Sequence, residues 1–200
     1  YSYLLTSAGL NMSPVISSVG AYIVSYGGYN QMGYLKASPN GELIANGSYA
    51  SNLVQVFNFN TTTGFLSNTI DLTGFSSDSY GVEFSPNSEV LYVSDISSGS
   101  VYQFDLLAGT AIDINNSKIN LGYTTNPAAL QLAPDGKIYV AELGSFYLGT
   151  IDFPDVFGSG CSFNSSSFYL NGKVSQGGLP TFYNSIFNSP AVGCDSVATV

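Results

Sequence analysis

The chain has 200 residues, of which 44% are hydrophobic and only 8% are charged. A core can therefore form, while solubility must rest on Ser, Thr, Asn, Gln and Tyr side chains rather than on charge. Four basic against 13 acidic residues give a formal charge of −9, which disfavours nucleic acid and anionic membranes, because both attract clustered Lys and Arg. No apolar run reaches the roughly 18 residues of a membrane-spanning helix, so we expect no direct membrane insertion.

The first predicted elements are two short strands within residues 1–20. The stretch YSYLLTSAG, which ends at Gly9, aligns residue for residue with VYQFDLLAG, which ends at Gly109. VYQFDLLAG itself lies in the middle of a repeating unit, at 73–121. We therefore predict that residues 1–20 are the outer strands of a truncated unit.

Three similar units follow, at 21–72, 73–121 and 122–171. Each contains a hairpin (GYLKASPNGELIAN, YGVEFSPNSEVLYVSD or ALQLAPDGKIYVAE) whose proline recurs after about 47 residues. A third apolar strand comes next (LVQVFNFN, SVYQFDLL, YLGTIDFP), and then a more variable fourth segment (FLSNTIDL, TAIDINNSKINL, CSFNSSSFYL). Four short strands per unit, with breaks at Gly, Pro, Asn and Asp and no helical period, are typical of a propeller blade.

The predicted fold class is therefore all-β, a β-propeller of WD40- or YVTN-like four-stranded blades. Residues 172–192 are predicted to form a closing segment. Because propellers close with typically four to eight blades, we expect a partial ring of a larger propeller. A closed ring of four blades is the alternative.

Catalytic candidates are few. The chain contains no histidine, so it cannot form a Ser-His-Asp or Cys-His relay or a zinc site of the usual kind. Glu83, Asp95 and Glu142 are the carboxylates that glycosidase-type chemistry would need in the central channel, two of them roughly 5 to 10 Å apart. We favour the alternative that they cap loops or accept backbone hydrogen bonds.

Three polar residues interrupt the apolar first strands at equivalent positions, namely Lys36, Glu83 and Gln131. One interpretation places them at the channel mouth, in contact with a ligand. The other pairs Lys36 with Glu83 between neighbouring blades, because a buried charge needs a partner. We favour the pairing.

The segment 24–34 (VSYGGYNQMGY) is the best candidate for a ligand-binding loop. Tyr26, Tyr29 and Tyr34 would give it a large contact area for a carbohydrate or protein ligand. The alternative is that these tyrosines only pack. No cofactor or metal is expected, although the segments 95–99 and 154–158 each offer one carboxylate to calcium, without the usual Asp-rich loop pattern.

The two cysteines, Cys161 and Cys194, are predicted to form a disulfide if the protein is secreted, which would stabilise the fold by roughly 3 to 4 kcal/mol. Two buried thiols are the alternative.

The stretches YGVEFSPNSEVLYVSD, AALQLAPDGKIYVAE and GLPTFYNSIF (178–187) resemble a propeller-like region of large Bacteroidetes surface proteins. Those proteins carry PKD-type domains and a gliding-motility-associated, type IX secretion C-terminal domain. The resemblance implies export to the outer cell surface or beyond, with adjoining domains of the parent chain as partners. It also implies that residues 193–200 lead into a following domain. It brings no catalytic residues.

These observations predict a non-catalytic cell-surface or secreted propeller module for adhesion, gliding or ligand and protein binding in a large exported bacterial protein. The alternative is a propeller hydrolase or lyase that uses channel-lining carboxylates.

Overall fold

The computed structural model describes residues 1–21, 32–49, 51–76 and 78–180, and it contains three four-stranded antiparallel sheets. The first sheet consists of β3 (Leu35–Ala37), β4 (Leu43–Ser48), β5 (Leu53–Asn60) and β6 (Phe65–Leu72). The second consists of β7 (Ser79–Phe84), β8 (Val90–Asp95), β9 (Ser100–Asp105) and β10 (Ile119–Tyr123). The third consists of β11 (Pro127–Leu132), β12 (Ile138–Glu142), β13 (Tyr147–Ile151) and β14 (Phe163–Tyr169).

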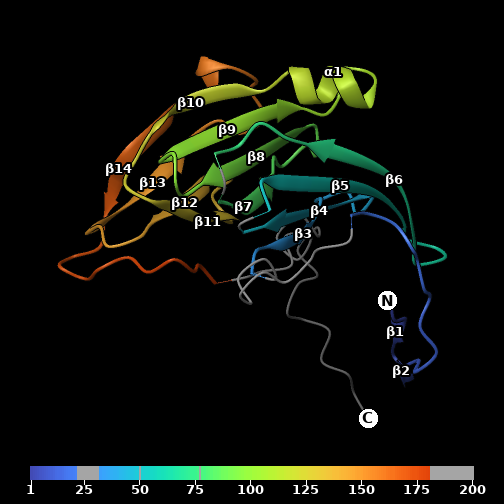
Figure 1. Ribbon diagram of the computed structural model, residues 1–200. Coiled ribbons are helices and arrows are strands. Elements are labelled where there is room, and N and C mark those ends of the chain that lie inside the picture. Colours follow the sequence, from blue (N-terminus) through green and yellow to red (C-terminus); the bar gives the residue numbers. More distant parts are fainter. Residues whose placement is uncertain (22–31, 50, 77, 181–200) are drawn as a thin grey trace, which may run out of the picture.

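Each sheet is a meander whose strands follow one another in chain order. The first strands β3, β7 and β11 lie side by side at the centre, and β6, β10 and β14 lie outermost (Figure 1). Sheets that radiate from adjacent first strands are blades, so the chain forms part of a β-propeller. The predicted all-β propeller fold is confirmed.

Direct backbone contacts join the inner strands of successive blades. Tyr34 N donates to Tyr80 O at 3.3 Å, between the first and second blades. Ser94 bridges the second and third blades, because its hydroxyl donates to Ala128 O at 2.6 Å and accepts from Gly81 N at 2.8 Å. The ring geometry therefore depends on close approach of backbone to backbone around the axis.

The segment that follows the third blade continues this pattern. Ala129 N donates to Gly177 O at 3.1 Å, and Ala129 is the residue of the third blade that corresponds to Tyr34 of the first. Gly177 thus occupies, beside β11, the place that Tyr80 occupies beside β3. The predicted closing segment begins, in its described part, along the inner edge of the third blade.

Residues 1–20 contain a small two-stranded sheet of β1 (Leu5–Thr6) and β2 (Gly9–Leu10). An isolated bridge between Ser2 and Val15 lies next to it. Its strands are exposed, and it extends away from the three blades in Figure 1. The segment returns to the first blade where Leu66 N donates to the hydroxyl of Ser17 at 2.9 Å.

The fourth segment of the second blade differs from the sequence prediction. Residues 110–121 were expected to be strand, but α1 (Ala111–Asn116) precedes β10, and β10 extends to Tyr123. Thr110 and Asp113 form a capping box, which satisfies the free amides of the first helical turn. The repeat alignment hid this local signal. Among the described residues, no helix is long and apolar enough to cross a membrane.

The turn between the first and second strands is closed in the same way in the first two blades, by a serine hydroxyl. In the first blade, the Ser38 hydroxyl accepts a hydrogen bond from Leu43 N at 2.9 Å, and in the second the Ser85 hydroxyl accepts one from Val90 N at 2.9 Å. The third blade has Ala133 instead and closes one residue earlier. This shorter turn makes Glu142 the structural equivalent of Asp95, at the end of the second strand.

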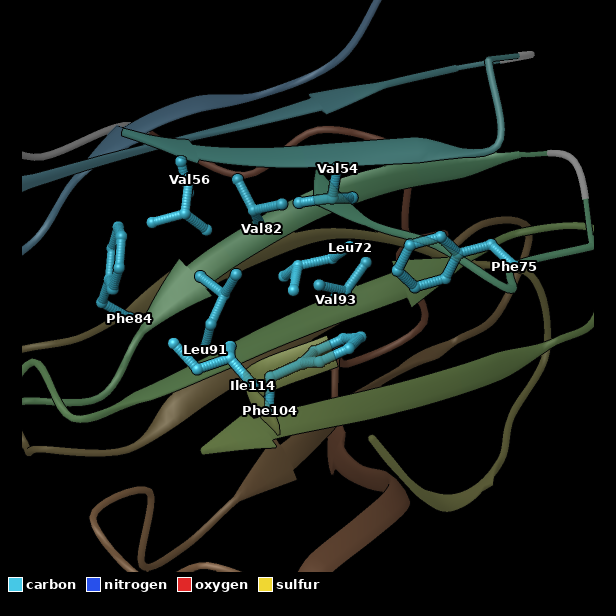
Figure 2. Packing of buried hydrophobic residues seen from close by; sticks show 11 residues of the cluster. Val54, Val56, Leu72, Phe75, Val82, Phe84, Leu91, Val93, Phe104 and Ile114 are labelled. Atoms are coloured by element: carbon cyan, nitrogen blue, oxygen red, sulfur yellow. The ribbon is translucent and has the colours of Figure 1, made fainter. Parts of the chain in front are cut away.

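The core lies between blades, which explains why β8 of the middle blade is buried along its whole length. Figure 2 shows Val54 and Leu72 of the first blade gathered in one cluster with side chains of the second blade, such as Val82 and Val93. A second cluster joins the second and third blades and includes Cys161. Each fully buried large apolar side chain stabilises the fold by about 1.5 to 3 kcal/mol.

Candidate functional site

Lys36, Glu83 and Gln131 meet on the inner strands of three different blades. Lys36 Nζ lies 2.8 Å from Glu83 Oε2 and 2.6 Å from Gln131 Oε1. Only 7% of the Lys36 side chain and none of Glu83 is exposed. The predicted ion pair between neighbouring blades is confirmed, and the contact with the third blade is an addition to it.

The Glu83 carboxylate is held by the backbone as well. Leu132 N donates to Glu83 Oε2 at 2.9 Å, and Phe84 N donates to Oε1 at 3.0 Å. Burial raises the pKa of Glu83, while Lys36 and these hydrogen bonds partly offset the rise. Each charged group here thus has partners within the protein, as buried charges require.

The other two candidate carboxylates, Asp95 and Glu142, are the last residues of the second strands β8 and β12. Asp95 is fully buried and accepts hydrogen bonds from Ser76 N at 2.6 Å and from the Ser76 hydroxyl at 2.9 Å. Ser76 belongs to the linker that enters the second blade. The carboxylate therefore ties this linker to the strand end, as the loop-capping interpretation predicts.

Glu142 has the same role in the third blade. It is fully buried, and it accepts hydrogen bonds from the Ser166 backbone amide and hydroxyl, each at 2.8 Å. The Thr124 hydroxyl of the preceding linker donates to it as well. A linker hydroxyl bonded to a carboxylate at the end of the second strand is thus common to both blades.

Tyr34 belongs to an aromatic cluster beside the axis. Its ring meets that of Tyr80 edge to face at 5.5 Å between centroids, and Tyr80 meets Tyr49 in the same manner at 6.3 Å. The Tyr34 hydroxyl accepts a hydrogen bond from Leu179 N at 3.4 Å. Tyr34 therefore packs between blades, while Tyr26 and Tyr29 lie outside the described residues.

The structure describes only some of the residues that the disulfide and calcium predictions named. Cys161 is a buried free thiol whose pKa is raised by burial, and Cys194 lies outside the described residues. In the segment 154–158, Asp155 Oδ1 accepts a hydrogen bond from Asn87 N at 2.9 Å. In the described part of the chain, no three Asp, Glu or Cys side chains gather as metal ligands would.

A surface groove on the first blade was not predicted. It has a volume of about 500 Å³ and lies at the end of the sheet that carries the turn after β5. The turn from Thr61 to Gly64 is much shorter than the corresponding segments of the other blades, 106–118 and 152–162. This difference in loop length can be read from the sequence, and it could have predicted the groove.

The fold and these sites define the class as a β-propeller segment whose inner polar residues are bonded across blades. No protein-family model matches the chain, and no curated protein sequence matches it.

Solved structures similar to the chain include hydrazine synthase from Kuenenia stuttgartiensis, with 15% identity, 80% of this chain and 40% of that chain covered, and a TM-score of 0.47. The PQQ domain of pyranose dehydrogenase from Coprinopsis cinerea is similar with 16% identity, 72% and 39% coverage and a TM-score of 0.48. U3-55K is similar with 17% identity, with 60% of this chain and 34% of that chain covered, and with a TM-score of 0.45. The chain spans less than half the length of each of these chains.

Proposed function

We propose that this chain is a non-catalytic binding module, a propeller segment of a larger exported protein that recognises a carbohydrate or protein at the cell surface. The observation that carries the proposal is the state of the three candidate carboxylates. Glu83 is paired with Lys36. Asp95 accepts hydrogen bonds from the linker that enters the second blade, and Glu142 accepts them from the linker that enters the third blade and from β14. A catalytic acid or base must reach substrate, whereas these groups hold the blades together.

The extracellular location and the adjoining domains belong to the same proposal. They are supported by the resemblance to exported Bacteroidetes surface proteins and by the low charge of the chain. Protease treatment of intact source cells, followed by immunodetection of this chain, tests the location. Loss of the signal without lysis is expected, and full protection would refute surface display.

A propeller hydrolase or lyase is the second candidate, because burial raises the pKa of Glu83, as in many general acids. The purified chain is passed over immobilised polysaccharides and surface proteins, and release of saccharide products is measured in parallel. We expect binding without product. Turnover that disappears in Glu83→Gln while binding persists would establish the enzyme instead.

A further inference from the structure

The groove on the first blade arises from unequal loops at equivalent places. In the second blade, the segment between the third and fourth strands contains α1, and the Ser117 hydroxyl accepts from Asp105 N at 2.9 Å. In the third blade, the corresponding segment covers the neighbouring sheet, where Gln103 Nε2 donates to Val156 O at 2.8 Å. In the first blade, a short turn leaves this corner open, and the groove of about 500 Å³ lies there.

The groove continues toward the N-terminal hairpin. A smaller hollow of about 210 Å³ shares Phe59, Thr61 and Thr62 with it, and Tyr3 and Asn11 also line that hollow. Pockets that bind small molecules typically have volumes of about 300 to 1,000 Å³. The size therefore suits a ligand of several rings lying along the turn.

A polar side chain of the groove, Asn58, makes fewer hydrogen bonds than the residues at the equivalent positions of the other two blades. Asn58 corresponds to Asp105, which accepts a hydrogen bond from Leu107 N at 2.9 Å, and to Asp152, which pairs with Lys137 at 2.8 Å. Among the described residues, the Asn58 side chain makes no hydrogen bond. Its amide is thus available to a ligand as both donor and acceptor.

The remaining lining residues are held in place but present polar atoms. The Asn60 side chain fixes the turn by accepting from Thr62 N at 3.0 Å and Thr63 N at 2.9 Å. Within the described part of the chain, Glu42 Oε2 accepts a single side-chain hydrogen bond, at 3.3 Å, from Asn40. Exposed polar groups on a rigid turn are suited to recognition.

These features together indicate the chemistry of the ligand. An amide, threonine hydroxyls and a carboxylate match the alternating donors and acceptors of sugar hydroxyls, and Phe59 offers apolar surface to a sugar ring. The described residues of the lining include no lysine or arginine, and the chain carries a charge of −9, which disfavours anionic ligands. We propose that the groove formed by Glu42, Asn58, Phe59, Thr61 and Thr62 binds a neutral oligosaccharide.

The proposal rests on the binding function proposed above, and it is tested on the whole chain by amide chemical-shift titration. The probes are neutral cello-, xylo- and manno-oligosaccharides of four to six units, with an oligogalacturonate as the anionic comparison. We expect at least one neutral probe to shift the amides of Phe59 and Thr62, and the anionic probe to leave them unchanged. Absence of any shift at millimolar neutral saccharide would overturn the proposal.

Variants locate the site. Asn58→Ala removes the amide, and Glu42→Gln replaces the carboxylate by a neutral amide; each should weaken binding by about tenfold or less. Asn58→Phe should fill the groove and abolish binding. Glu89→Gln is the matched control, because Glu89 follows the equivalent turn of the second blade and accepts from Asn87 in the same manner, at 2.8 Å. It should leave the affinity unchanged.

The outcomes separate the two proposals. If a polysaccharide binds the chain and the affinity survives Asn58→Phe, the groove is not the site, and the binding module stands. If no polysaccharide or surface protein binds, the proposed function fails as well. Calcium that causes the same amide shifts in the absence of sugar would replace the saccharide with a cation.

Discussion

Replacing Lys36 with methionine tests whether the contact between three inner strands holds the propeller together. Methionine keeps much of the length and apolar character of the side chain but removes the charge that faces Glu83 and Gln131. Glu83 is fully buried, so its carboxylate cannot gain water in exchange. Breaking a buried ion pair by removing one partner costs about 3 to 5 kcal/mol, a large part of the typical 5 to 15 kcal/mol of a folded domain.

The chain contains its own control. Lys137 and Asp152 are also 2.8 Å apart, but 42% of the Lys137 side chain is exposed. Exposed pairs contribute little to stability, so Lys137→Met should change the urea midpoint far less than Lys36→Met. The double variant Lys36→Met/Glu83→Gln removes the uncompensated charge and should recover part of the loss. Urea unfolding followed by circular dichroism measures all three.

The pH dependence follows from the pKa of Glu83. Burial raises it above the ordinary value of 4.5, so the folded state holds this proton more tightly than the unfolded state does. Stability from Glu83 is thus present below pH 4.5 and is lost as the pH rises through the folded-state pKa. Without Lys36 that pKa rises further, and the deficit of Lys36→Met should grow from acidic to neutral pH. A deficit equal to that of Lys137→Met, or one independent of pH, would refute the reasoning.

Three further predictions concern stability and use the same urea midpoint. Ser76→Ala removes the hydroxyl that donates to Asp95 at 2.9 Å, and we expect a loss of about 1 to 3 kcal/mol; no loss would mean that the linker is held by other contacts. Phe104→Ala empties a fully buried site between two blades and should cost about 3 to 5 kcal/mol, so a change below 1 kcal/mol would contradict the interblade core. Gly81→Ala would place a Cβ 2.2 Å from Ala128 O and force the second and third blades apart, at a cost of at least about 1 to 3 kcal/mol; a stable variant would show that this junction is loose.

Local chemistry alone predicts the blade. The Pro-Asn turns at Pro39 and Pro86, the apolar strands on either side of them and the period of about 47 residues act within one unit. A strand is specified by its own side chains and a turn by two or three residues. The fold class could therefore be predicted before any contact was known. The helix at 111–116 was missed because the repeat alignment outweighed a local capping signal at Thr110.

Contacts between blades depend on the tertiary structure. The pairing of Lys36 with Glu83 could be inferred from equivalent positions, but the contact with Gln131 could not, because it depends on how sharply the inner strands turn about the axis. The open corner beside Asn58 likewise depends on what the loops of each blade cover. Sequence patterns therefore determined the repeating element, and only the packing of one blade against the next decided which polar groups are used internally and which remain for a ligand.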